Sequence, residues 1–234
     1  LGAADVCWRM PDRIRHGYGL STKLAEECLA LKPDVLVTVD HGISSIDGVA
    51  KVREAGVRVV VTDHHLPGPT LPAADVIVNP NRPDGDFLSR YLAGGGVLFH
   101  VLMCVCGELR SRGDAADFRL DSLLDLVALG TVADLVRLDE NNRRLVRQGL
   151  ERIRRRHCCA GVAALLEVAG RNLAHVAASD LGFIAGPRLN AAGRLDDISI
   201  GIRCLLTDDP DDAMALAGEL DRFNRDRQQL QSDM

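Results

Sequence analysis

The pattern of hydrophobic and polar positions divides the chain into two parts. Short apolar runs rich in β-branched residues indicate buried strands at 35–39, 57–61 and 76–78. Amphipathic segments indicate helices at 20–31 and 44–55. Strand, helix and strand at this spacing form a βαβ unit, so we predict a parallel sheet with helices on its faces. A segment rich in Pro, Gly and Asn, from 67 to 86, predicts a loop around the third strand.

From Gly96 onward the pattern is helical. The predicted helices cover 96–112, 121–133, 140–156, 160–169, 175–184, 197–206 and 210–232. The fold class expected is therefore α/β, with a parallel-sheet part followed by a mainly helical part. The last amphipathic segment ends without a capping glycine, which is typical of a helix that leads elsewhere. We therefore expect one domain over 1–208 and the start of a linker helix over 209–234.

Length and composition exclude several classes of protein. The chain has 234 residues, of which 47% are apolar and 26% charged, a balance typical of a globular protein and not of a disordered one. Its apolar runs fall short of the ~20 residues that cross a bilayer, so no membrane partner is expected. Because the first residue is Leu1 and not Met, we expect the chain to be a piece of a longer protein.

The cysteines and arginines bear on the redox compartment and on possible ligands. Seven cysteines form no C-x-x-C pair, which favours reduced core thiols in a cytosolic protein over disulfides or a zinc site. Nearly all basic residues are arginines, with lysine only at 23, 32 and 51. GC-rich coding explains this bias as well as phosphate binding does, for which the planar fork of arginine is the better tool.

The strongest chemical signal follows the first two predicted strands. Asp40-His41-Gly42 follows one strand and Asp63-His64-His65 the next. Ligands of open α/β sheets bind outside the carboxyl ends of the strands, so these side chains are expected in one crevice. Carboxylates mixed with imidazoles favour Mn²⁺ or Mg²⁺ over zinc. The alternative is that both acids only cap the helices that follow, while the histidines fill loop space.

Two further acids stand in the apolar segment 123–136. A buried carboxylate must be paired or bind a metal, because burying it bare costs several kcal/mol. Asp134, near the end of the segment, is the better candidate for a metal site, although a buried salt bridge to arginine explains it equally well. For Asp125 a buried salt bridge to arginine is the favoured interpretation.

Two basic features complete the candidates. Residues 186–194, Gly-Pro-Arg-Leu-Asn-Ala-Ala-Gly-Arg, indicate a loop that presents donors to a phosphate, or an ordinary turn between helices. The stretch 137–157 holds eight arginines against three acids. It suits the neutralisation of nucleic-acid phosphates, and a solvated helix face explains it equally well. The triple glycine at 94–96 is too short a hint of nucleotide binding, and a helix-entry turn is favoured.

Several motifs together resemble the RecJ family of single-strand-specific 5′→3′ DNA exonucleases, within the DHH phosphoesterase superfamily. They are Pro-Asp-Arg (11–13), Gly-Tyr-Gly (17–19), Thr-Val-Asp-His-Gly-Ile-Ser (38–44), Val-Thr-Asp-His-His (61–65), Val-Asn-Pro-Asn (78–81), Leu-Gly-Thr-Val-Ala-Asp (129–134) and the segment 186–194. Asp-His-His marks only the superfamily, whereas its combination with the segment 186–194 is specific to RecJ-like enzymes. The resemblance runs over essentially the whole chain.

The resemblance implies a role for each candidate. Metal ligands would be Asp40, His64, His65 and Asp134, and catalytic residues His65 and Asp63. Substrate-binding residues would be Arg13, Arg188, Asn190 and Arg194. His41 stands where many relatives carry Asn, so it receives no role.

The resemblance also implies an activity and its limits. Two divalent metals about 4 Å apart would lower the pKa of an attacking water and stabilise the leaving oxygen of a DNA phosphodiester. The family's first acidic metal motif and its first strand would lie upstream of Leu1, and a second nucleic-acid-gripping domain downstream of Met234. We therefore expect an incomplete two-metal site and weak or no activity of this chain alone.

Partners and rival functions follow from the same resemblance. It implies single-stranded DNA as substrate, single-strand-binding protein and a helicase as partners, a monomer, and a role in DNA repair and recombination in the cytoplasm. One alternative is a DHH phosphodiesterase acting on short oligonucleotides or cyclic dinucleotides. The other is a non-catalytic replication scaffold with a DHH-like fold.

Overall fold

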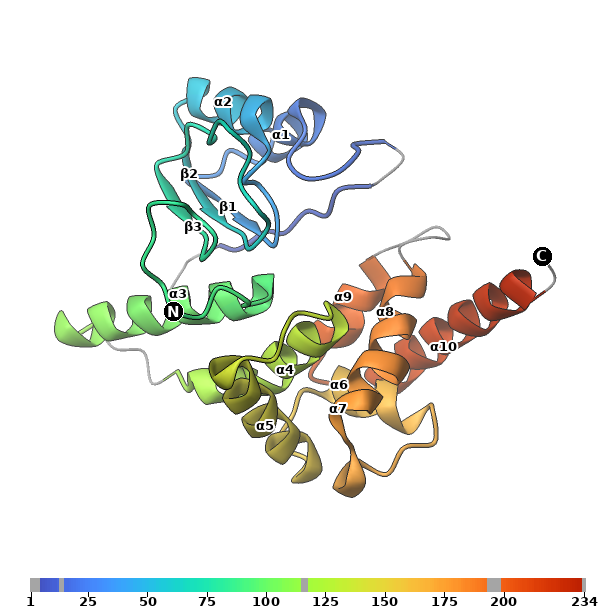
Figure 1. Cartoon of the computed structure of the whole chain (residues 1–234). Helices are drawn as coiled ribbons and strands as arrows, with labels where there is room; N and C mark the ends of the chain where they lie inside the picture. Colours follow the sequence, from blue (N-terminus) through green and yellow to red (C-terminus); the bar gives the residue numbers. More distant parts are fainter. Residues whose placement is uncertain (1–4, 13–14, 115–117, 193–198, 233–234) are drawn as a thin grey trace. The chain divides into compact units, whose positions relative to one another are not determined.

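The computed structural model describes residues 5–12, 15–114, 118–192 and 199–232. The chain divides into two compact units, Leu1–Phe118 and Arg119–Met234. The first holds the sheet and the second consists of helices, so the expected change from α/β to α is confirmed (Figure 1). No helix among the described residues is long and apolar enough to cross a bilayer.

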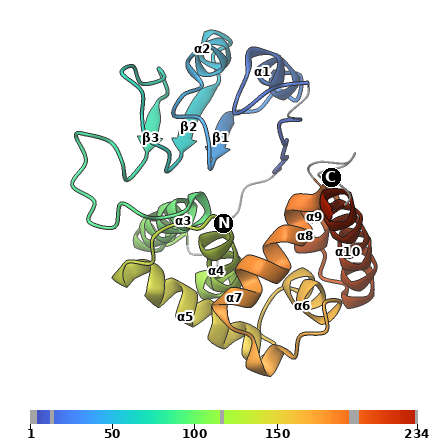
Figure 2. The same ribbon diagram turned by 45° about the vertical axis from the view of Figure 1, so that its right-hand side comes forward.

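The first unit is built on a three-stranded parallel sheet. Its elements are α1 (Thr22–Leu29), β1 (Val35–Val39), α2 (Ile46–Glu54), β2 (Arg58–Thr62), β3 (Val76–Val78) and α3 (Gly94–Ser111). The strand order is β1-β2-β3, and Val39 pairs with Thr62 at the carboxyl end of β1. Figure 2 shows the strands side by side, with these ends turned toward α3.

Helices α1 and α2 cover one face of this sheet. Their buried Leu24, Val49 and Val52 pack with Val59 and Val61 of β2 into one apolar cluster. The other face of β1 carries exposed valines at 35, 37 and 39. The prediction of a fully buried first strand is therefore wrong for alternate residues, because β1 is an edge strand of the described sheet and successive side chains point to opposite faces.

The second unit is a helical assembly around a separate apolar core. Its elements are η1 (Leu120–Leu123), α4 (Leu124–Ala133), α5 (Glu140–Arg154), α6 (Ala160–Glu167), η2 (Leu173–His175), α7 (Ala178–Asp180), η3 (Leu181–Ala185), α8 (Gly186–Ala192), α9 (Ser199–Leu206) and α10 (Pro210–Ser232). Helix α10 contributes buried Ala213, Leu216, Ala217 and Leu220 to this core. The first half of α10 thus belongs to the second unit. The proposed boundary at 208 and the linker role of 209–234 stay predictions.

One predicted loop is helical instead. The described part of 186–194 forms α8, which continues directly from the π-helical turn η3. A proline inside a helix lacks an N–H and its ring clashes with the carbonyl four residues earlier. The wider π-helical turn directly before Pro187 provides room for that ring, so the helix continues through the proline.

Candidate metal centre

Asp40 and Asp63 stand side by side because their strands are in register. Each comes directly after its strand, and the ladder extends through both residues. The Asp40 amide donates to the carbonyl of Thr62 at 3.0 Å, and the Asp63 amide donates to that of Val78 at 3.1 Å. The carboxyl edge of the sheet therefore fixes the main chain of both acids.

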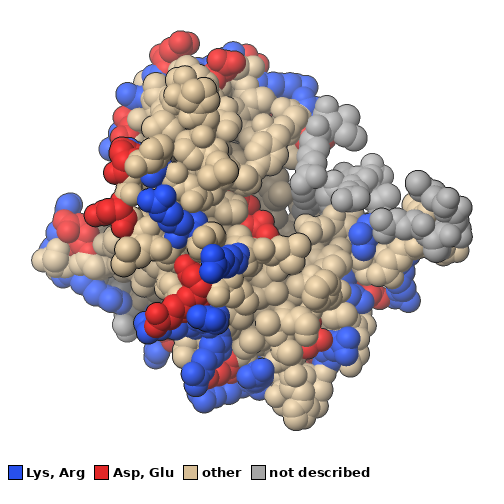
Figure 3. All heavy atoms as spheres, viewed as in Figure 1, with Lys and Arg blue, Asp and Glu red and all other residues tan. Residues whose placement is uncertain are grey.

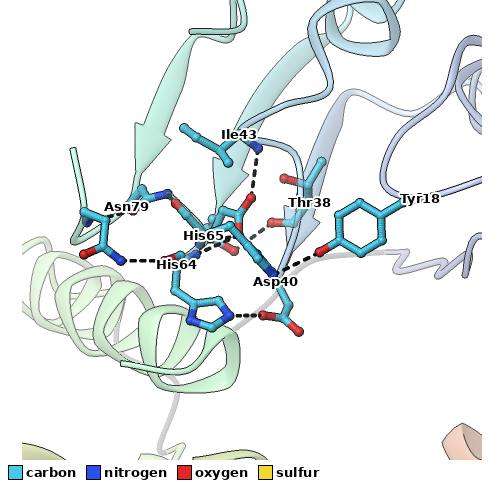
Figure 4. A network of polar contacts seen from close by, with 10 residues as sticks. Tyr18, Thr38, Asp40, Ile43, His64, His65 and Asn79 are labelled. Atoms are coloured by element: carbon cyan, nitrogen blue, oxygen red, sulfur yellow. Dashed lines mark hydrogen bonds and ion pairs between the residues drawn. The ribbon is translucent and has the colours of Figure 1, made fainter. Parts of the chain in front are cut away.

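Asp40 reaches into open space at this edge. Its φ of 65° lies in the left-handed region, which aspartate tolerates better than most residues. The side chain is 52% exposed, and its Oδ1 lies 3.0 Å from Nε2 of His64 (Figure 4). The strained turn after β1 thus aims a solvent-facing carboxylate at an imidazole.

Asp63 has the opposite environment, with only 1% of its side chain exposed. Its Oδ2 accepts from the amide of Ile43 at 2.9 Å, and its Oδ1 accepts from the amides of His64 and His65 at 2.7 and 3.1 Å. Burial raises the pKa of Asp63, but these amides and the His65 ring outweigh burial and leave the pKa below its usual range. The helix that follows Asp63 is α3, whose N-cap is Ala93, and none of these donors lies in it, so the helix-capping alternative is wrong for Asp63.

His65 is held in one tautomer. Its Nδ1 lies 2.7 Å from Oδ1 of Asp63, and because a carboxylate only accepts, Nδ1 carries the proton and donates it. In the neutral ring Nε2 then carries the lone pair, and it lies 3.1 Å from the hydroxyl of Tyr18, which can donate to it. Asp63 thus orients His65 as a ligand or proton acceptor, as the carboxylates behind metal-binding histidines do.

The donor set fits a divalent cation. One ligand atom each from Asp40, His64 and His65 lies within 4.8 Å of the other two. Two neighbouring ligands of an octahedral ion with bonds of about 2.1 Å are about 3.0 Å apart, which matches the contact of Asp40 with His64. One carboxylate with two imidazoles is a donor set for Mn²⁺ and other first-row transition metals, and water would fill the remaining positions.

The loop after β3 supports the histidines from behind. Asn79 Nδ2 donates to the carbonyl of His65 at 2.9 Å, and Asn81 Nδ2 donates to that of His64 at 2.6 Å. Sequence reasoning gave no role to these asparagines or to Tyr18. The signal that could have found them is the Asn-Pro-Asn motif directly after a strand, where amide side chains meet the neighbouring strand end.

His41 stays outside this cluster. Burial lowers its pKa and outweighs the carboxylates of Asp63 and Asp40, which raise it. The imidazole is therefore neutral at pH 7.

The other predicted ligand and the predicted substrate residues belong to the second unit or lie outside the described residues. Asp134 ends α4 in the second unit, where it is exposed, so its place among the ligands stays a prediction. Asn190 is exposed on α8. Arg13 and Arg194 lie outside the described residues.

Arg188 is engaged inside the second unit. Its side chain is 12% exposed, its Nε donates to Asp221 Oδ1 at 2.9 Å, and its Nη1 donates to the Ile184 carbonyl at 2.8 Å. Arg225 binds the other oxygen of Asp221 at 2.5 Å. Arg188 therefore joins α8 to α10, and its role toward substrate stays a prediction.

Among the residues that the structure describes, Asp125 has no arginine partner, contrary to the favoured interpretation. It is fully buried, and its Oδ2 accepts from the amide of Cys159 at 2.7 Å. The acid lies in the first turn of α4, where it meets the main chain at the start of α6 and not a side-chain cation.

The basic stretch is partly neutralised. Arg144 and Arg147 pair with Glu140 and Glu151 along α5, and Arg152 pairs with Asp121. Figure 3 shows acidic side chains among the basic ones on this part of the surface. This arrangement favours the interpretation as a solvated helix face.

The fold and the site together define a class: an α/β protein with a candidate divalent-metal centre at the carboxyl edge of a parallel sheet. The model of the N-terminal domain of the DHH family matches residues 2–131. The chain belongs to the DHH family.

The chain is also similar to named proteins. It is 51% identical over 237 residues to the single-stranded-DNA-specific exonuclease RecJ of Haemophilus influenzae and 50% identical over 239 residues to that of Escherichia coli. Both alignments cover 100% of this chain and 41% of the relative, so the chain spans about two fifths of their length. The resemblance to RecJ is thereby confirmed.

Solved structures agree with this result. A crystal structure of exonuclease RecJ bound to manganese matches with a TM-score of 0.82 and 37% identity, over 96% of this chain and 55% of that one. RecJ from Thermus thermophilus in complex with Mn²⁺ matches with a TM-score of 0.77 and 36% identity, over 91% of this chain and 31% of that one.

Proposed function

We propose that the whole protein is a metal-dependent exonuclease that hydrolyses phosphodiester bonds in single-stranded DNA from the 5′ end. The observation that carries the proposal is the convergence of Asp40, His64 and His65 on one small volume. The names of the relatives support the activity and the substrate, and their manganese complexes support the metal. Digestion polarity and a role in repair and recombination rest on the family resemblance.

Each residue of the cluster has a part in this chemistry. Asp40 and His64 would hold the cation, and His65 would join them or accept a proton through its Nε2 lone pair. Asp63 fixes the His65 ring through Nδ1. A divalent cation held here would acidify a water molecule and neutralise charge on the phosphate.

The chain alone offers too few ligands for two metals. Three ligand atoms converge among the described residues, whereas each octahedral ion takes about six. We propose Asp134 as a further ligand, with acids from outside the chain as the rest. The isolated chain is accordingly expected to be weakly active or inactive.

Substrate contacts are proposed for Arg13, Arg188, Asn190 and Arg194. The Arg188 guanidinium carries five N–H donors and binds Asp221 and the Ile184 carbonyl with some of them, so a phosphate contact is compatible with its ion pair. Partners proposed from the resemblance are single-strand-binding protein and a helicase. All seven cysteines are free thiols, which supports a location in the reducing cytoplasm. That the enzyme is a monomer is proposed from the resemblance.

The test is release of mononucleotides from 5′-labelled single strands by the whole protein with Mn²⁺. Activity should disappear in Asp40→Asn and persist in Asp34→Asn, an exposed acid just before the same strand. Equal activity of both variants would contradict the proposal. Dinucleotide cleavage without digestion of long strands would indicate the oligonucleotide phosphodiesterase, and no metal-dependent cleavage would indicate the scaffold. The close RecJ relatives disfavour both alternatives.

A further inference from the structure

Helix α3 begins in direct contact with Asp40. A Cβ atom built on Gly94 would lie 2.2 Å from Oδ1, 2.4 Å from Cβ and 2.5 Å from Cγ of Asp40. All three distances are far below a van der Waals contact, so no side chain fits at this position in the present arrangement. The next residue, Gly95, is exposed, and a Cβ there would meet nothing within 4 Å.

Asp40 cannot avoid such a contact by turning its side chain. Rotation about χ1 moves Oδ1 and Cγ but leaves Cβ in place, because the main chain sets the position of Cβ. That main chain is held by the 3.0 Å hydrogen bond from the Asp40 amide to Thr62 and has a φ of 65°. A methyl group at Gly94 would therefore displace the turn at Asp40 or the start of α3.

The start of α3 is itself packed. Leu92, Ala93 and Val97 are each 2% exposed, so the buried face of the helix start that carries Gly94 is embedded, while Gly95 faces solvent. Close-packed interiors transmit such a displacement to their neighbours. The turn that carries Asp40, whose side chain is half-exposed, is the side that yields more easily.

We propose that Gly94 is a positioning residue for the metal centre. Its missing side chain leaves the space that the Asp40 carboxylate occupies, and this keeps Oδ1 within 3.0 Å of His64 Nε2. Gly94 touches neither metal nor substrate in this role and acts through Asp40. The expected effect on metal binding rests on the proposed metal-dependent function. The steric contact between Gly94 and Asp40 does not depend on it.

The first experiment measures Mn²⁺ affinity in the whole protein by electron paramagnetic resonance of the free ion. Gly94→Ala should weaken Mn²⁺ binding at least tenfold, whereas the matched Gly95→Ala should leave it within twofold of the parent. Circular dichroism confirms that the compared proteins are folded. Unchanged Mn²⁺ affinity of Gly94→Ala, or an equal loss in both variants, would overturn the proposal.

The second experiment tests the contact without metal. Gly94→Ala should lower Tm in the parent protein. In an Asp40→Gly background the same substitution should lower Tm by at most half as much, because the three atoms nearest to the new methyl group are gone. This arm also decides the case in which Gly94→Ala does not fold. A double variant that stays as unstable as Gly94→Ala overturns the proposal. A parent protein that binds no Mn²⁺ would contradict the proposed function. The Tm comparison would still show whether Gly94 and Asp40 are in steric contact.

Discussion

The two units use acidic side chains in different ways. In the first unit the half-exposed Asp40 faces an imidazole, and the buried Asp63 receives hydrogen bonds from three amides and the His65 ring. In the second unit Asp221 is enclosed by two arginines, and Asp125 accepts a main-chain amide. The sheet positions both acids at its strand ends, and Asp40 remains available to a ligand. Asp125 and Asp221 instead join one helix of the second unit to another.

The largest effect is expected from Asp221→Ala. Removing this carboxylate leaves the guanidinium of Arg188, which is 12% exposed, without its counter-charge. Breaking one partner of a buried pair costs about 3–5 kcal/mol in the free energy of unfolding. Urea denaturation measures it, with the exposed Asp226→Ala on the same helix as control, expected within about 0.5 kcal/mol of the parent. Equal stabilities of the two variants would show that the pair does not hold the helices.

Asp40→Asn should leave the stability of the protein nearly unchanged and weaken its metal binding. Asparagine tolerates the left-handed φ, and the side chain is 52% exposed, so the free energy of unfolding should change by less than about 0.5 kcal/mol. Mn²⁺ affinity should fall by about a hundredfold or more, since even an outer-shell partner is worth about 10–100-fold. Calorimetric titration measures it. A stable protein that still binds Mn²⁺ would remove Asp40 from the ligand set.

The thiols of the second unit should be unreactive. Burial raises the pKa of Cys158 to about 11 and of Cys159 to about 12, from an ordinary 9.0. At pH 8 a pKa two units higher leaves about a hundredfold less thiolate, so these two should react with a disulfide reagent far more slowly than the exposed Cys7 and Cys104.

The same shifts predict a loss of stability in alkali. The contribution of these thiols is fully present below the pKa of about 8.5 in the unfolded chain, and it is lost as pH rises through about 11. Urea midpoints measured from pH 8 to pH 11 check this. Midpoints that stay level, together with equal reaction rates of all thiols, would mean that the two cysteines are open to solvent.

The smallest effect is expected from Asn81→Ala. This variant loses the hydrogen bond to the His64 carbonyl but no ligand atom, so Mn²⁺ affinity should fall about tenfold. Asp86→Ala, an exposed substitution in the same loop, should leave it unchanged. If the two variants bind Mn²⁺ equally well, the loop after β3 does not hold the histidines.

Local patterns predicted most of the elements and the convergence of Asp40, His64 and His65, because both depend on short segments and on the register of neighbouring strands. Asp40 and Asp63 could be placed together since the carboxyl ends of parallel strands share one edge. The contact of Gly94 with Asp40 could not be predicted, because it depends on how closely a helix approaches a turn more than fifty residues away. The ion pair of Arg188 could not be predicted for a similar reason, since its partner Asp221 lies on a later helix.

The most direct test of the central claim is a crystal structure of the whole protein grown with Mn²⁺, with anomalous scattering recorded at the manganese edge. The account predicts an anomalous peak bonded to Asp40 and His64, with His65 beside it. A protein whose only manganese peaks lie away from these three side chains would contradict it.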